Sequence, residues 1–265
     1  YEAKMFWHYD HRWNTYDQEE TRDLTISEKK NPAYFANSRY WVSEKEVDNK
    51  LGETSKKWLI GFRDITNATN ERTSIFTFIP KTAVGNNAPL LLLEEKGAGI
   101  SACIVANLCC LVFDFPTRHK VGGTHINFFI AKQLPVLPPT YYTLHDIHFI
   151  ASRVVELVYT ANDMQPFVQD ILDEFGVKTW NEWYPDARLN NSSSLPNPFC
   201  WDEGRRALLR AELDAYYARL YGLTRDELRY ILDPQDVYGP DFPGETFRVL
   251  KEKEIRQYGE YRTRR

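Results

Sequence analysis

The sequence predicts an α+β protein, in which a unit built on a mixed β-sheet precedes a helical unit. Residues 57–65 are rich in β-forming side chains, and residues 73–80 alternate apolar and hydroxyl side chains with period two, as strands do. Beyond residue 140 the apolar period becomes helical, and Pro138-Pro139 separates the two patterns. We therefore expect two domains, residues 1–139 and 140–265, and a length of 265 residues can hold both.

The first domain is expected to combine short strands, long loops and one buried helix. Residues 1–53 are aromatic and polar, which favours short strands and loops. A capping box at Thr25 and Glu28 predicts a single helical turn before Asn31-Pro32. Residues 57–80 form a hairpin around the turn cluster TNATNER, and residues 100–115 are apolar on nearly every side, which predicts a buried helix. Residues 119–139 return to a β pattern, with Gly122-Gly123 at a turn.

The second domain is expected to be a series of capped helices. Thr143 and Asp163 are suited to cap the first two, of which the second ends near Gly176, and NNSSS at 190–194 lies in a polar loop. A third helix, over residues 203–221, ends at Gly222. A capping box at Thr224 and Glu227 opens a short helix, and a charged helix spans 245–258.

Composition and charge narrow the possible classes of protein. The chain is 43% hydrophobic and 26% charged, which is typical of a packed globular protein. Its net charge of −4 hides a local excess of cations: residues 54–139 hold nine Lys/Arg against five Asp/Glu, a net +4, so nucleic acid is not excluded. No apolar run is long enough for a membrane anchor, and four cysteines without metal-site spacing favour the cytoplasm. Because the chain opens at Tyr1 without an initiator methionine, we expect a piece of a longer protein.

Motifs of catalysis are weak. Lys96-Gly97-Ala98-Gly99 resembles a cofactor loop, but it lacks a third glycine, and a turn is favoured. Glu94 and Lys96 match a nuclease pair only if distant Asp64 joins them. His8 with His11, and His145 with His148, lack a third ligand and are expected to be core or hydrogen-bonding histidines. We therefore predict no catalytic, cofactor-binding or metal-binding residue in this chain.

Two polar concentrations are the candidate binding residues. The first, within GFRDITNATNERT at 61–73, holds side chains of the types that hydrogen-bond base edges and phosphates; they are Arg63, Thr66, Asn67, Thr69, Asn70, Arg72 and Thr73. Of these, Arg63, Asn67, Asn70 and Arg72 are our choices for base contacts. The second brackets Gly122-Gly123, whose missing side chains let backbone amides approach a phosphate. It comprises Arg118, His119, Lys120, Thr124, His125 and Asn127. Of these, Arg118, Lys120 and Thr124 are chosen for phosphates. A solvated polar turn is the alternative for both, and composition alone slightly favours it for the first.

Four segments carry a resemblance to a known family: YEAKMFWHYDHRW, GFRDITNATNERT, KVGGTHINFFIAKQLPVLPP and RAELDAYYARLYGLTRDELRYILDP. Together they resemble the C-terminal part of large bacterial adenine-specific DNA methyltransferases, namely type IIG restriction-modification enzymes and phage-defence methylases of the DISARM kind. The end of the third segment is also similar to target-recognition domains of type I specificity subunits. The resemblance implies a target-recognition region that follows the catalytic methyltransferase domain.

The expected function is sequence-specific recognition of double-stranded DNA, which directs adenine N6 methylation by a domain outside this chain. The resemblance implies S-adenosylmethionine for the parent enzyme and none for this fragment. The family's Asn-Pro-Pro-Tyr motif has no counterpart here, since Asn31-Pro32-Ala33-Tyr34 lacks the second proline. The expected partners are duplex DNA and the N-terminal methyltransferase domain of the same parent chain. The alternative is a protein-interaction module of a bacterial phage-defence complex, in which the aromatic N-terminus and the helix at 203–221 dock on partners.

Overall fold

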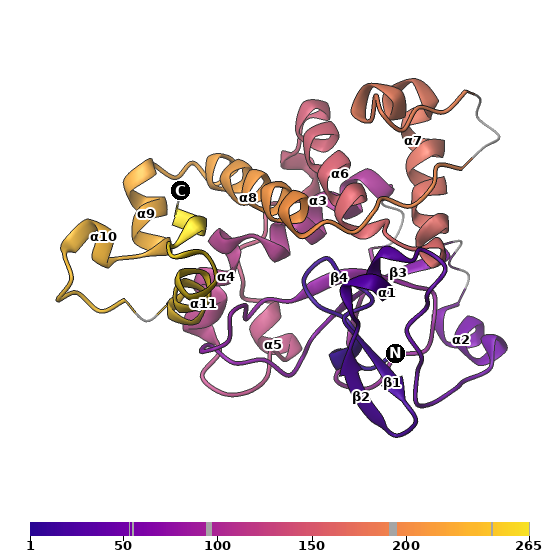
Figure 1. Ribbon diagram of the computed structural model, residues 1–265, viewed down its shortest axis with the longest axis horizontal. Helices are drawn as coiled ribbons and strands as arrows, with labels where there is room; N and C mark the ends of the chain where they lie inside the picture. Colours follow the sequence, from indigo (N-terminus) through magenta and orange to yellow (C-terminus); the bar gives the residue numbers. More distant parts are fainter. Residues whose placement is uncertain (53, 55, 94–96, 191–194, 245, 265) are drawn as a thin grey trace.

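The computed structural model describes residues 1–52, 54, 56–93, 97–190, 195–244 and 246–264, and within them the chain is an α+β protein, as predicted. Figure 1 shows an elongated molecule with α9, α10 and α11 at one end, and β1, β2 and α2 at the other. The described strands are β1 (Asn14–Asp17), β2 (Glu20–Asp23), β3 (Trp58–Phe62), β4 (Phe76–Pro80) and β5 (Leu90–Leu91). The described α-helices are α1 (Ile26–Lys30), α2 (Glu44–Leu51), α3 (Ala98–Cys109), α4 (Leu111–Lys120), α5 (Phe128–Ala131), α6 (Leu144–Val158), α7 (Gln165–Trp183), α8 (Glu203–Leu220), α9 (Arg225–Leu232), α10 (Gln235–Tyr238) and α11 (Arg248–Tyr258). Short 3-10 turns lie at Ala3–Met5, Pro139–Tyr141, Asn162–Met164 and Arg262–Arg264.

The hairpin predicted over residues 57–80 is confirmed. β3 pairs antiparallel with β4, with Ile60 opposite Phe78, and β5 lies on the other edge of β3. Every residue of β3 is buried: Trp58, Ile60 and Phe62 pack in the core with the helices, and Leu59 packs with Phe6 and Ala88 on the other face. β1 and β2 form a separate antiparallel hairpin, so each strand pairing in the described part of the chain is antiparallel and the expected mixed sheet is not seen there.

The buried helix predicted at 100–115 is confirmed, in two pieces. α3 ends at Cys109, Cys110 adopts an extended conformation, and α4 continues past Pro116 to Lys120. Among the described residues no single helix has both the length and the apolar character to cross a bilayer, although α3 and α4, bent by 55°, meet these criteria as a pair.

The β pattern predicted for residues 119–139 is wrong. The segment contains the end of α4, one isolated bridge between Ile65 and His125, and the single turn α5. Asn127 caps α5 by accepting a hydrogen bond from the backbone of Ile130 at 2.9 Å, and this local bond competes with strand pairing. The prolines that follow lack the N–H that a ladder needs.

The helices predicted after residue 143 are confirmed, with changes at their ends. The capping boxes at Thr143 and Thr224 are present. Asp163 does not cap α7, whose N-cap is Met164, and Gly176, with φ of 77°, kinks α7 but does not end it. α11 begins at Arg248, and the predicted start at 245 lies outside the described residues. α2, capped by Ser43, was not expected.

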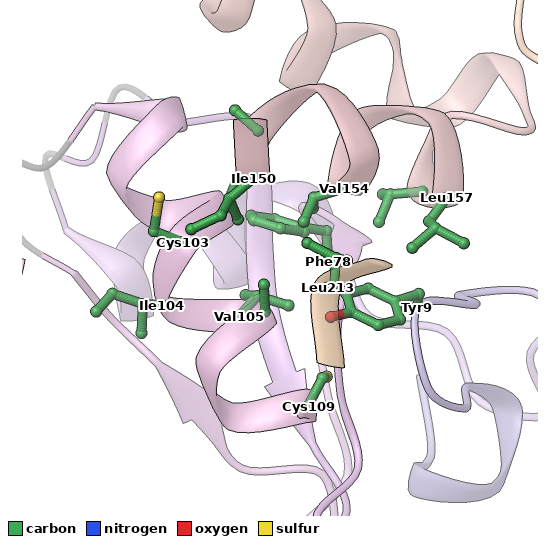
Figure 2. Packing of buried hydrophobic residues seen from close by; sticks show 14 of the residues in the cluster. Tyr9, Phe78, Cys103, Ile104, Val105, Cys109, Ile150, Val154, Leu157 and Leu213 are labelled. Carbon is green, nitrogen blue, oxygen red and sulfur yellow. The ribbon is translucent and has the colours of Figure 1, made fainter. Parts of the chain in front are cut away.

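One hydrophobic core joins the two predicted domains. Figure 2 shows Cys103 and Val105 of α3 packed beside Ile150 and Val154 of α6, with Leu213 of α8 close by. The same cluster includes residues of β3 and β4. Residues 1–139 and 140–265 therefore share a core, and the prolines at 138–139 mark a turn within it.

Candidate nucleic-acid interface

The two polar concentrations lie side by side. The backbone N–H of Thr66 donates to the carbonyl of Thr124 at 3.0 Å, and the N–H of Ile126 donates to the carbonyl of Asp64 at 2.9 Å. These bonds flank the bridge between Ile65 and His125. Segments more than fifty residues apart in sequence thus form one surface, which we call the joined loops: residues 64–73 and 119–133.

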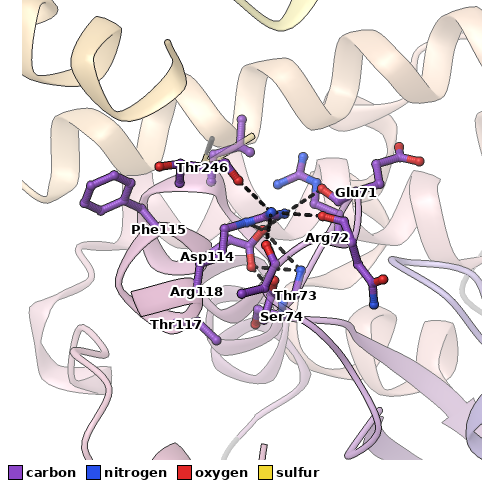
Figure 3. Close-up of polar contacts among 12 residues, drawn as sticks. Glu71, Arg72, Thr73, Ser74, Asp114, Phe115, Thr117, Arg118 and Thr246 are labelled. Carbon is purple, nitrogen blue, oxygen red and sulfur yellow. Dashed lines mark hydrogen bonds and ion pairs between the residues drawn. The ribbon is translucent and has the colours of Figure 1, made fainter. Parts of the chain in front are cut away.

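Arg118 holds the first of these segments from inside. Its guanidinium donates to Asp114 of its own helix at 3.0 Å and lies 4.4 Å from the ring of Phe247. It also donates to four backbone carbonyls, those of Ala68 (3.0 Å), Asn70 (2.9 Å), Glu71 (2.7 Å) and Thr246 (2.7 Å). Figure 3 shows this group between the loop and α4. Burial lowers the pKa of Arg118, and Asp114 opposes that shift.

Asp114, the partner of Arg118, also binds the backbone of this loop. Its fully buried carboxylate accepts hydrogen bonds from the backbone of Thr73 at 3.1 Å and Ser74 at 2.7 Å. The Thr66 hydroxyl donates to the Thr73 carbonyl at 2.8 Å, and the Thr73 hydroxyl donates to the Asn67 carbonyl at 3.0 Å. The loop therefore uses its threonines and its nearest cation to satisfy its own backbone.

Four of the residues predicted to contact DNA are consequently buried and not at the surface, contrary to the prediction: Thr66, Arg72, Thr73 and Arg118. Arg72 is 8% exposed, and its Nη2 lies 3.5 Å from Asp214 of α8. Arg63 is half-buried; its Nε donates to the carbonyl of Phe6 at 2.7 Å, and its guanidinium covers the ring of Trp7. Residue type and loop position suggested DNA contacts for these side chains but did not fix their direction.

The other predicted residues lie at or near the surface. Asn70, Lys120 and Thr124 are exposed, and their side chains make no hydrogen bond or ion pair with the residues that the structure describes. Asn67 is partly exposed, with its Oδ1 accepting from Thr69, and exposed Asn127 uses its Oδ1 to cap α5. These five residues are the part of the predicted site that a partner can reach.

Sequence reasoning missed an aromatic feature on the same surface. Phe128 and Phe129 of α5 are 58% and 76% exposed, and Lys132 follows them. From residue 115 to residue 145 the sequence has no Asp or Glu, while it holds Arg118, Lys120 and Lys132. A signal was present in the sequence, since two adjacent phenylalanines follow a run of small and polar residues.

The glycines near residue 97 serve packing against α7. A side chain at Gly97 would meet the carboxylate of Glu174, and one at Gly99 would meet the ring of Phe175 within 2.5 Å. The backbone of Gly99 also donates to Glu174 at 3.0 Å. In a cofactor loop, the space beside such glycines is occupied by a phosphate. Here an acidic side chain and a phenyl ring occupy it. Glu94 and Lys96 lie outside the described residues.

The histidines and the Asn31 segment have structural partners. Buried His8 bonds the Cys109 carbonyl at 2.7 Å, and buried His11 bonds Asp163 at 2.9 Å. The Asn31 carbonyl accepts from Arg12 at 2.9 Å. No group of three His, Cys, Asp or Glu side chains suited to a metal ion occurs in the described ranges.

The comparisons with known proteins add no relative. No protein-family model, no curated protein and no solved structure matches the chain. The case for a function therefore depends on the residues and geometry of the site.

Proposed function

We propose that this chain recognises double-stranded DNA in a sequence-specific manner through the joined loops, and thereby directs adenine N6 methylation by a catalytic domain of a parent protein. The observation that supports the proposal is the backbone pairing of the two polar segments, whose residues Asn70, Lys120 and Thr124 are exposed. S-adenosylmethionine belongs, in this proposal, to that catalytic domain.

The exposed groups fit the chemistry of a duplex. A carboxamide can make two hydrogen bonds to adenine in the major groove, which suits Asn70 and Asn67. Lys120 and Lys132 supply cations for phosphates, and the acid-free stretch around them contains no carboxylate of its own to repel the backbone. Exposed Gly122 and Gly123 leave the backbone of the same loop open to a phosphate.

The aromatic pair adds a second means of contact. Phenyl side chains stack on unpaired bases or wedge between base steps, and proteins that extrude a target base must unstack it. Phe128 is anchored by an edge-to-face contact with Phe62 of β3, at 6.2 Å between centroids, while Phe129 is more exposed. We assign Phe129 the wedge and Phe128 its support.

The test is selection from a random duplex pool, followed by fluorescence anisotropy over a salt series. Lys120→Ala is expected to weaken binding to all duplexes and to reduce the salt slope by about 1, whereas Asn70→Ala is expected to cost about 1–3 kcal/mol and to relax preference at one base pair. Phe129→Ser is expected to reduce DNA distortion measured by energy transfer between end labels. Lys45→Ala, an exposed lysine on α2, is the matched control. Failure to bind any duplex at low salt would refute the proposal.

A docking module is the second candidate, favoured by one observation. Residues 35–42 expose several large apolar side chains, of which Trp41 is 83% exposed. In this case the purified chain binds a methyltransferase domain of its parent and Trp41→Ser abolishes that binding, while duplexes do not bind at all. Binding of both a duplex and that domain would instead indicate that the chain has both functions, in different segments.

A further inference from the structure

A large cleft lies between the C-terminal helices and the turn at Glu71 and Arg72. Its volume is about 1340 Å³, and its walls come from α8, α9, α11 and the 3-10 turn that follows. These helices are adjacent at the C-terminal end of the molecule in Figure 1. α8 contributes a wall of small and apolar residues, including Ala207, Leu208 and Ala211. The cleft is large enough for a small organic molecule.

Two arginines line the cleft without sufficient partners. Arg72 is nine-tenths buried, and its Nη1 has no hydrogen-bond partner, although Nη2 is 3.5 Å from Asp214. Partly exposed Arg210, four residues before Asp214 on α8, makes no hydrogen bond or ion pair with any residue the structure describes. A buried guanidinium normally has its donors satisfied and its charge balanced.

Burial opposes the charge of Arg72, but Asp214, Asp114 and Glu71 together raise its pKa; these carboxylates also have other partners. Asp214 is engaged by the backbone of Leu111 at 2.7 Å, and Glu71 pairs with Lys253 at 2.7 Å. Glu203 is exposed and accepts from Trp201 at 2.7 Å. Burial and the charge of Arg72 lower the pKa of Arg210, which is the effect of two cations confined together. Nη1 of Arg72 and the guanidinium of Arg210 are therefore the donors in this cleft that an anion can use.

We propose that Arg72 and Arg210 bind the oxyanion, a phosphate or a carboxylate, of a small molecule whose organic part lies along Leu208 and Ala211. Guanidinium groups bind both anions through paired hydrogen bonds. Arg210 is the more exposed of the two, and the unbonded Nη1 of Arg72 supplies a further donor in the same cleft. This site does not depend on DNA recognition by the joined loops.

The experiment measures thermal unfolding of the full chain in chloride buffer, with sodium phosphate, acetate or chloride added at matched ionic strength. A saturable rise in Tm with phosphate or acetate, and none with chloride, is expected because a ligand that binds only the folded state stabilises it. The more effective of the two anions identifies the ligand's acid group. Arg210→Gln is expected to weaken the apparent affinity at least tenfold, and to leave Tm in chloride equal or higher, because Arg210 has no internal bond to lose.

Arg188→Gln, an exposed arginine outside the cleft, is the control and should respond as the parent does. An equal rise with chloride, or an undiminished response in Arg210→Gln, would overturn the proposal. So would a loss of duplex binding in Arg210→Gln with its phosphate response intact, since the cleft would then serve DNA. A chain that fails to bind duplexes but retains the Arg210-dependent phosphate response would refute only the proposed DNA function.

Discussion

Arg118→Met removes the group that organises the base of the joined loops. The guanidinium bonds four carbonyls from two distant segments and the buried carboxylate of Asp114. Methionine fills a similar volume over the ring of Phe247 but supplies no donor. The variant therefore isolates the effect of charge and hydrogen bonding from that of packing.

The expected loss of stability follows from the buried groups that Arg118→Met leaves without a partner. Asp114 is fully buried and pairs with Arg118, so removal of the guanidinium leaves a buried carboxylate without its cation, which typically costs about 3–5 kcal/mol. Adding each carbonyl bond separately would overcount, because the loop can relax towards water. We expect the free energy of unfolding to fall by about 3–5 kcal/mol. Arg118→Lys restores the charge but not the planar fork and is expected to recover part of the loss.

Urea unfolding followed by fluorescence of the seven tryptophans measures this change. Exposed Arg188→Met, which removes the same charge elsewhere, should change stability by less than about 0.5 kcal/mol. The double variant Asp114→Asn with Arg118→Met should be more stable than the sum of the single changes predicts, by about 1–3 kcal/mol. If Arg118→Met lowers the free energy of unfolding by less than about 1 kcal/mol and shows no coupling to Asp114, the pair of Arg118 and Asp114 is not what holds the loop.

Two further predictions concern the buried N-terminal segment. His8 is held neutral in the fold, since burial above all, together with Arg72 and Arg210, lowers its pKa well below 6.5. Only the unfolded state then gains a proton as pH falls below about 6.5, so the free energy of unfolding should decrease from pH 7 to pH 5. For this one group the slope approaches about 1.4 kcal/mol per pH unit. Urea titrations of His8→Gln should lack this pH-dependent loss of stability. The Lys29 ammonium contacts the rings of Trp13 and Trp201 and pairs with buried Asp10 at 2.6 Å. Lys29→Met should therefore lower the free energy of unfolding in urea by about 3–5 kcal/mol, whereas exposed Lys30→Met should leave it nearly unchanged. Equal effects of the two variants would contradict the role of the pair.

The sequence was most informative where local physics decides the structure. The capping boxes at Thr143 and Thr224 form because the threonine hydroxyl and the acidic side chain three residues later satisfy each other's backbone amides. The hairpin of β3 and β4 follows from residues whose apolar side chains suit a buried sheet. In both cases the interacting groups are close in sequence or share a period, so the pattern alone predicts the element.

The candidate site depends on contacts between distant segments, and the sequence alone could not predict which of its polar side chains are buried and which are exposed. Arg118 and Lys120 are two residues apart and share a charge, yet one is buried against four carbonyls and the other faces water. One of those carbonyls belongs to Thr246, which is more than a hundred residues away in the sequence. The predicted strand at 119–139 failed for a related reason, because Asn127 satisfies a helical turn locally.

The shared core predicts that the two halves are not independent folding units. α3 lies in the first half, while α6 and α8, which cover it, lie in the second, and the hydroxyl of Tyr217 donates to the Cys103 carbonyl at 2.6 Å across the boundary. Each fragment, 1–139 or 140–265, would expose a face of this core and is expected to lack a cooperative urea transition and to bind a dye for exposed apolar surface. Mixing the fragments should restore a cooperative transition, because the missing faces are complementary. A sharp transition of residues 1–139 alone, with m proportionate to their size, would show that the joined loops rest on a self-sufficient domain, and that the contacts with α6 and α8 are an interface between domains and not part of a common core.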